Sequence, residues 1–180
     1  MRDIAHLTTE RLVLRPLRPD DADAVVAGVG NYDVAKWLAV VPFPYDRSDA
    51  ESFLASTAAE ARRTWAICDA SGLCGVISAQ DELGYWLARS AWGRGYAREA
   101  AEAVRDAVFA DPTRKRLTVS HMVGNDRSEK VIRYLGFRAV GATRRRFRAL
   151  GQDAETVLYE MTRAEWRRLR RAAQRDRATT

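Results

Sequence analysis

The chain has 180 residues, 47% of them hydrophobic, and a formal net charge of +6. This length suits a single domain with a sizeable core, and the basic charge favours anionic ligands or partners without constraining the fold. No apolar run reaches the roughly 18 residues of a membrane span, and the N-terminal residues lack the apolar segment of a signal peptide. We therefore expect a cytoplasmic protein with no membrane partner.

Strand and helix signals alternate from the start of the chain. Residues 11–17 (RLVLRPL) alternate apolar and polar side chains, which predicts a strand. A short helix is expected in 18–28, where acidic residues suit the positive N-terminal end of a helix. A second helix is expected in 49–62.

The middle of the chain predicts a hairpin, a further strand and the clearest helix. TWAIC (64–68) and CGVIS (74–78) form the hairpin, and ELGYWLA (82–88) is the next strand. In 94–109 small apolar residues recur at helical spacing, while charged residues, among them Arg105, face elsewhere.

The C-terminal part adds a strand at 116–122 and a helix at 128–135. Gly136, a favourable C-terminal capping residue, stops this helix. Residues 137–144 and 155–161, joined by a charged turn, predict a terminal antiparallel pair.

These elements predict one domain over 1–166, of the mixed-sheet α/β or α+β class, because hairpins occur together with a β-α-β crossover. The basic tail, 167–180, resembles an ordinary solvated helix. Cys68 and Cys74 flank the hairpin loop and are expected as thiols rather than a disulfide.

No metal site is expected, because neither cysteine has the Cys or His neighbours that such a site requires. His121 falls in an alternating strand pattern, which favours a hydrogen-bonded structural histidine over a ligand or a base.

Two glycines, Gly93 and Gly95, lie where the strand at 82–88 gives way to a helix. A helix N-terminus presents unpaired N–H groups, and glycine lets the backbone approach a phosphate closely. Arg94 adds a cation. Alone this pattern is more typical of a structural turn, and Arg98 occupies the place where a dinucleotide fingerprint needs a third glycine.

A second stretch, NDRSEKVIRYLGF (125–137), changes this balance. Asn125 is placed as a helix N-cap, with Ser128 in the first turn. Together with TERLVLRPLRPDDADAV, ELGYWLARSAWGRGYAREA and LYEMTRAEW, it makes the chain resemble the GNAT superfamily of acyl-CoA-dependent N-acyltransferases. The similarity is greatest to the branch of RimJ/RimL-type ribosomal-protein N-terminal acetyltransferases, and spans roughly residues 8–166.

The resemblance implies a fold and a cosubstrate. The fold would be a mixed, mostly antiparallel central sheet of about six or seven strands, splayed in the middle and flanked by helices. The cosubstrate would be acetyl-CoA, with Leu87, Ala88 and Asn125 holding its pantetheine arm. The family's pyrophosphate loop, Gln/Arg-x-x-Gly-x-Gly/Ala, falls on Trp92, Gly93, Arg94, Gly95, Tyr96 and Ala97. Trp92 departs from the usual Gln or Arg, which we expect to be tolerated because backbone N–H groups hold the phosphates.

The resemblance also implies catalytic groups. Glu82 matches a position often proposed as the base acting through water; equally, it could be a hairpin-turn carboxylate beside Asp81. A backbone N–H near Leu87 or Ala88 would stabilise the oxyanion. Ser128 matches the serine that takes the leaving-group acid role in the RimJ/RimL branch, or serves only in capping or cofactor contact.

The tyrosine that many GNAT enzymes use as this acid is replaced here by Ile132. Tyr134, two residues further on, is rotated about halfway round the helix from that site. The resemblance therefore points to Ser128 rather than to a tyrosine.

The acceptor side is specified least. Trp37, Phe43, Tyr45 and Trp86 either line the acceptor cleft or serve as packing anchors. The arginines of 144–148 either border the cleft, attracting an acidic acceptor or ribosomal RNA, or form a solvated turn.

Three functions stay open. The first is acetylation of a protein or peptide N-terminal α-amine, for example of a ribosomal protein; the second is acetylation of a small amine such as an antibiotic, polyamine or metabolite. The third is a non-catalytic acetyl-CoA-binding module. Nucleic acid is not expected as a substrate, and a homodimer is expected only because family relatives are often dimers.

Overall fold

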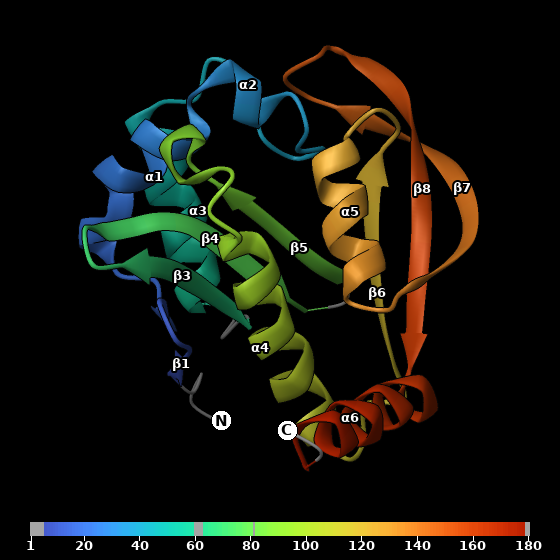
Figure 1. Cartoon of the computed structure of the whole chain (residues 1–180). Helices are drawn as coiled ribbons and strands as arrows, with labels where there is room; N and C mark the ends of the chain where they lie inside the picture. The colour runs from blue at the N-terminus through green and yellow to red at the C-terminus, as the bar shows by residue number, and fades with distance from the viewer. Residues whose placement is uncertain (1–5, 60–62, 81, 179–180) are drawn as a thin grey trace.

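The computed structural model describes residues 6–59, 63–80 and 82–178, with side chains described up to residue 175 (Figure 1). Asp81 and residues 60–62, named above, lie outside the described residues. In the part described, eight strands form one sheet in the order β1-β2-β3-β4-β5-β6-β8-β7. Neighbouring strands are antiparallel except β5 and β6, which are parallel.

The N-terminal half contributes β1 (Leu7–Thr8), β2 (Val13–Pro16), the 3-10 helix η1 (Pro19–Asp21), α1 (Ala22–Val29), α2 (Tyr32–Ala35), α3 (Arg47–Ala59), β3 (Thr64–Asp69) and β4 (Gly72–Ala79). The C-terminal half contributes β5 (Glu82–Leu87), the 3-10 helix η2 (Arg89–Ala91), α4 (Tyr96–Ala110), β6 (Arg116–Met122), α5 (Asp126–Tyr134), β7 (Arg138–Phe147), β8 (Gln152–Thr162) and α6 (Arg163–Ala178). The mixed sheet confirms the expected fold class, and the two-residue β1 brings the strands to eight instead of six or seven.

Helices cover both faces of the sheet. Figure 1 shows α4 and α5 in front of it and α1 and α3 behind it. The main core lies between the sheet and α4, where Ala100, Ala101 and Val104 are fully buried. A second core joins α1 to α3 and includes Trp86 and Trp92 at its border.

The helix at α4 departs from the expected pattern at one residue. Arg105 was expected to face away from the core, but its side chain is buried. It donates to the carbonyl oxygen of Leu135 at 3.1 Å and pairs with Glu102 and Asp106. The guanidinium therefore joins α4 to the end of α5, a role that helical periodicity alone does not reveal.

Of the two alternatives for the arginines of 144–148, the solvated turn is wrong for the first three, and the charged turn expected after residue 144 starts later. Arg144, Arg145 and Arg146 belong to β7, and the chain reverses only at 148–151. The end of this hairpin is fastened to the segment after α2. The N–H of Arg148 donates to the Ala39 carbonyl at 3.1 Å, and its Nη1 to the Val40 carbonyl at 3.2 Å.

Cys68 and Cys74 are free thiols, and the Cys74 S–H donates to the carbonyl of Ile67 at 3.4 Å. Among the described residues, none of the helices combines the length and the apolar composition needed to cross a bilayer.

Candidate functional site

The sheet opens between its two parallel strands. Among the described residues, β5 and β6 pair through Glu82 with Thr118 and Leu83 with Val119, and beyond Leu83 and Val119 the strands diverge (Figure 1). A cavity of about 620 Å³ occupies the opening. Its lining comes from both faces of the sheet, since Glu82 and Trp86 point to one face and Leu83 and Tyr85 to the other.

The exposed edge of β5 carries free backbone groups. Leu87 lies opposite Gly75 on β4, and the next N–H, that of Ala88, donates to the Cys74 carbonyl at 2.8 Å. In an antiparallel ladder this makes Leu87 part of a non-hydrogen-bonded pair, so its own N–H points away from β4 and into the opening. The Ala88 N–H is occupied, whereas the Leu87 N–H, like that of Tyr85 two residues earlier, points away from β4 toward the cavity.

A glycine loop lies at one end of the cavity, where α4 begins. Gly93 and Gly95 have φ of +76° and +79°, a left-handed conformation that disfavours other residues. Gly95 is the N-cap of α4, so the first N–H groups of the helix are presented beside the loop. Gly93, Gly95, Tyr96 and Ala97 line the cavity, whereas Arg94 does not and pairs with Asp69 at 3.5 Å.

Trp92, at the position where the family usually has Gln or Arg, makes a specific contact of its own. Its indole Nε1–H donates to the Leu87 carbonyl at 2.9 Å, which fixes the loop to the end of β5. The guanidinium of Arg127 lies 4.1 Å from the Trp92 ring centroid, and that of Arg89 lies 5.4 Å from it. The ring therefore holds two cations near the loop, in place of one cationic or amide side chain.

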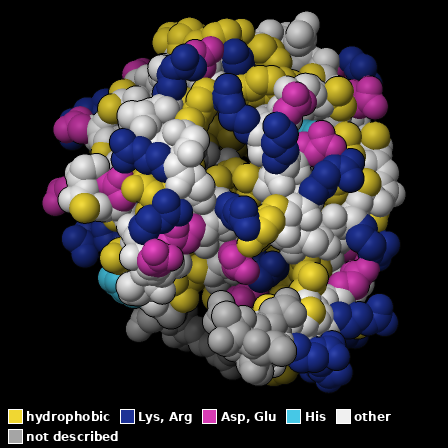
Figure 2. Space-filling model, viewed as in Figure 1, with side chains coloured by type: hydrophobic (Ala, Val, Ile, Leu, Met, Phe, Trp, Pro, Cys, Tyr) yellow, Lys and Arg dark blue, Asp and Glu magenta, His cyan; other side chains and the backbone are white. Residues whose placement is uncertain are grey.

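Basic side chains surround this opening. Figure 2 shows a hollow with hydrophobic side chains in its floor and Lys and Arg side chains around it. Those that line the cavity are Arg98, Arg127, Lys130 and Arg145. Such a rim attracts an anionic ligand.

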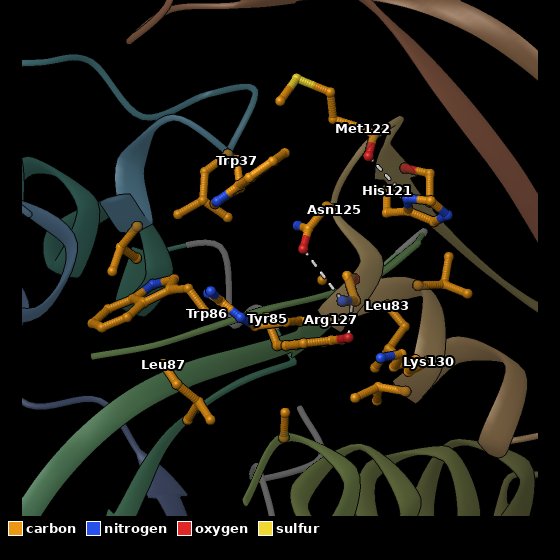
Figure 3. Close-up of a pocket in the computed structure, with 18 of the residues that line it drawn as sticks. Trp37, Leu83, Tyr85, Trp86, Leu87, His121, Met122, Asn125, Arg127 and Lys130 are labelled. Atoms are coloured by element: carbon orange, nitrogen blue, oxygen red, sulfur yellow. Dashed lines mark hydrogen bonds between the residues drawn. The ribbon is translucent and has the colours of Figure 1, made fainter. Parts of the chain in front are cut away.

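Helix α5 brings two predicted residues to the cavity. Asn125 caps the helix, its Oδ1 accepting from the Ser128 N–H at 3.3 Å (Figure 3). The Ser128 hydroxyl lies 3.0 Å from the hydroxyl of Tyr85, on β5. Burial raises the pKa of Tyr85 to about 12, so the phenol is protonated at neutral pH and can donate to Ser128. The capping interpretation is correct for Asn125, and Ser128 also faces the cavity.

The two positions considered above for a tyrosine that acts as the leaving-group acid, 132 and 134, both lie on α5. Ile132 is fully buried in the core. Tyr134 is half exposed and lies against the guanidinium of Arg98, at the rim of the cavity.

Three polar side chains meet on the other face of the sheet. The Ser120 hydroxyl, on β6, donates to Oε1 of Glu82, and Arg145 Nη2, on β7, lies 3.1 Å from Oε2. Arg145 Nη1 also donates to Ser120 Oγ at 3.1 Å. Glu82, the first residue of β5, therefore lies in the wall of the cavity and is bound by side chains of the adjacent strand β6 and of the edge strand β7.

Aromatic and apolar side chains complete this face. Figure 3 shows Trp37 and Trp86 on one side of the cavity and Met122 on the other. Phe43 and Tyr45 do not line it: Phe43 packs against the ring of Tyr32, and Tyr45 borders the second core. Burial raises the pKa of Tyr45 to about 12.

His121 lines the cavity as a fully hydrogen-bonded side chain. Nδ1 lies 2.9 Å from the carbonyl of Met122, which can only accept, so Nδ1 carries the proton (Figure 3). Nε2, 3.1 Å from the Tyr159 hydroxyl, is then the acceptor. This agrees with the expected structural role. Among the described residues, no group of three or more His, Cys, Asp or Glu is arranged to hold a metal ion.

Among the residues that the fold brings to the cavity, the sequence did not single out Tyr85, Ser120 or Thr156, and for Arg145 it left the cleft as one of two alternatives. Tyr85 and Ser120 lie inside strands that were predicted, and period-two alternation assigns each a face without naming its partner. Arg145 belongs to a run of arginines in which no single residue stands out, and Thr156 lies in an ordinary strand pattern. Only the pairing of distant strands shows that they meet.

Comparison with known proteins agrees with this geometry. Residues 11–138 match the family model described as an acetyltransferase (GNAT) domain. The protein p20 of Bacillus licheniformis, named as an N-acetyltransferase, is 28% identical over 174 residues, which cover 89% of this chain and 97% of p20. YdaF of Bacillus subtilis strain 168, named as a candidate ribosomal N-acetyltransferase, is 26% identical over 176 residues, 87% and 94% of the two chains.

Among solved structures, RimL, a ribosomal L7/L12 alpha-N-protein acetyltransferase in complex with coenzyme A, superposes with a TM-score of 0.75. It is 16% identical, and the match covers 88% of this chain and 98% of RimL. This likeness shows the fold. The family match spans most of the chain and includes the glycine loop and α5, so the protein belongs to the GNAT family of acetyltransferases.

Proposed function

We propose that this protein transfers the acetyl group of acetyl-CoA to the α-amino group at the N-terminus of a protein or peptide. One observation carries the proposal: a single cavity reaches from the glycine loop of α4 to Glu82 on the opposite face of the sheet. A thioester and an amine could therefore approach one another through the opening between β5 and β6. Holding both reactants converts a bimolecular attack into an effectively unimolecular one.

The glycine loop and the edge of β5 suit coenzyme A. Left-handed Gly93 and Gly95 leave the backbone N–H groups at the start of α4 accessible to a pyrophosphate. The N–H of Leu87, which faces the opening, is suited to an amide carbonyl of the pantetheine arm or to the oxyanion. RimL and the acetyltransferase MccE have been solved with coenzyme A and acetyl-CoA, respectively, which supports this assignment.

The reaction needs one base and one proton donor. The nitrogen lone pair attacks the thioester carbonyl carbon, the C–N bond forms and the C–S bond breaks, giving the N-acetyl amine and free coenzyme A. Glu82 accepts the proton of the amine, directly or through water, and Ser128 supplies one to the departing sulfur. Tyr85, hydrogen-bonded to Ser128, orients that hydroxyl.

An α-amine is the favoured acceptor on chemical grounds. Its pKa is near 8, so a useful fraction is already neutral at neutral pH, while a lysine amine near 10.4 depends far more on a base. The names of YdaF and RimL, which both refer to ribosomal N-acetylation, support a protein acceptor.

A thiol-release assay tests the proposal. The protein is incubated with acetyl-CoA and either peptides with free N-termini or a panel of small amines, and the coenzyme A thiol is measured. Thiol release with peptides, abolished when their N-terminus is blocked, is expected. Release with small amines alone would contradict the peptide acceptor. Tight acetyl-CoA binding without release for any acceptor would contradict catalysis.

A further inference from the structure

The side of the cavity that Glu82 faces, which we call the acceptor side, contains a buried polar atom that has no partner among the described residues. Thr156, on β8, is 1% exposed and lines the cavity, and its hydroxyl has no hydrogen-bond partner within the described part of the chain. An unpaired buried hydroxyl costs stability, so such groups commonly meet water or a ligand.

Strand register places this hydroxyl on the same face as the Glu82 group. Thr156 lies opposite Met122 on β6, two residues from Ser120, and opposite Thr143 on β7, two residues from Arg145. Because directly opposed residues share a face and alternate residues return to it, Ser120, Arg145 and Thr156 all face the acceptor side.

Arg145 has donors to spare at this place. A guanidinium has five N–H donors, and the contacts to Ser120 and Glu82 engage two of them. Its side chain is 38% exposed, so part of it remains accessible from the cavity. Its neighbours Arg144 and Arg146 lie on the opposite face by strand alternation, and Arg146 pairs with Asp153 at 3.7 Å.

The charges at this site are balanced only while Glu82 is a carboxylate. When Glu82 takes the proton of the acceptor amine, the partly buried Arg145 loses its counter-charge. A carboxylate on the acceptor would replace that charge, and the planar guanidinium binds carboxylates in bidentate fashion. Because Arg145 and Glu82 are in contact, the amine and the carboxylate of the acceptor must lie within a few bonds of one another.

We infer that Arg145 and Thr156 form a recognition site for a carboxylate close to the reactive amine, so that acceptors with an acidic first or second residue are preferred. The inference rests on the proposed function, because it states which α-amines that site selects. Arg145 donates to the carboxylate and Thr156 adds its unpaired hydroxyl. Glu82 is left to receive the amine.

Matched acceptors and variants test this site. The wild-type protein is assayed with peptides beginning Asp-Ala, Asn-Ala, Ser-Asp and Ser-Asn, and in parallel with free amino acids and their amides. We expect kcat/KM for the acid to exceed that for its neutral isostere by about ten-fold, the value of one charge-assisted hydrogen bond. Arg145→Gln should abolish this preference, and Arg146→Gln, the matched control on the other face, should retain it.

Thr156→Val gives an independent readout. It is nearly isosteric and removes an unpaired hydroxyl, so the melting temperature should not fall, while KM for the acidic acceptor should rise several-fold and KM for acetyl-CoA should not change. Equal use of acidic and neutral acceptors by the wild type would overturn the inference and leave peptide acetylation intact. A carboxylate preference among small amines only would uphold the site and overturn the peptide acceptor. If Arg146→Gln lowered the preference for acidic acceptors as much as Arg145→Gln, the preference would come from general electrostatic attraction, and the proposed site would be overturned.

Discussion

The hydroxyls of Tyr85 and Ser128 are 3.0 Å apart, and one comes from β5 while the other comes from α5. The high pKa of Tyr85, caused by burial, keeps it a donor over the whole neutral range. Ser128 can then point its own proton toward the cavity. In the proposed mechanism Tyr85 is a positioning residue, because it acts through Ser128.

We predict that Ser128→Ala and Tyr85→Phe both lower kcat at saturating acetyl-CoA. The expected loss is about ten-fold, below that of a typical general acid, because a thiolate already leaves readily. KM for acetyl-CoA should change little in Tyr85→Phe. The double variant should be no slower than Ser128→Ala, since both substitutions interrupt one chain of hydrogen bonds. Additive losses in steady-state kinetics would show that Tyr85 acts independently.

Local motifs reveal some of these residues and not others. Gly93, Gly95 and Asn125 could be found from sequence, because a turn and a helix cap are formed by neighbours in the chain. Thr156 could not, and Arg145 only as one of several arginines that either border the cleft or form a turn, because β7 and β8 reach Glu82 only through strand pairing across long stretches of chain.

At the scale of elements, the junction of β5 with α4 places the glycine loop. Helix positions were predicted well, because apolar side chains at helical spacing must face a core. Helical spacing was misleading for Arg105, because its long side chain reaches a buried carbonyl. The end of β7 was predicted as a turn for another reason: an exposed edge strand tolerates a run of arginines, which is also typical of a turn.

We predict that Gly93→Ala raises KM for acetyl-CoA at least several-fold. The left-handed φ of +76° penalises any side chain by roughly 1–2 kcal/mol, and a β-carbon would crowd a phosphate at this loop. Gly151→Ala is the matched control, because Gly151 has a φ of +64°, is equally open, and lies in the β7–β8 turn. Both variants should lose similar stability in urea melts, and only Gly93→Ala should change KM. An equal KM in both would remove the loop from the binding site.

For the whole molecule, weak acids whose pKa is raised by burial set the behaviour at high pH, among them one cysteine and two tyrosines. Burial raises the pKa of Cys74 to about 11 and of Tyr45 and Tyr85 to about 12, above the ordinary values of 9.0 and 10.0. As pH rises, the unfolded chain loses these protons first. The unfolded state therefore gains stability relative to the folded state between about pH 9 and pH 12.

We predict that the melting temperature is constant between about pH 7 and pH 9 and then falls steadily toward pH 12. Tyr85→Phe removes one of the groups and should make the fall less steep. Circular dichroism melts at pH 8 and pH 11 measure the effect. A melting temperature that does not change over this range would show that these groups titrate alike in both states.

The contact of Arg148 with Ala39 and Val40 joins the β7–β8 turn to the segment after α2 beside the cavity, and we call this closed span of backbone the arch. A chain end can pass beneath an arch, whereas the middle of a folded polypeptide cannot. If the proposed acceptor chain enters beneath the arch, selection would depend on position along that chain, before any side chain is recognised. A peptide with a free N-terminus and an internal lysine should be acetylated at the terminus alone, as mass spectrometry of the product would show; modification of the lysine would mean that the arch opens.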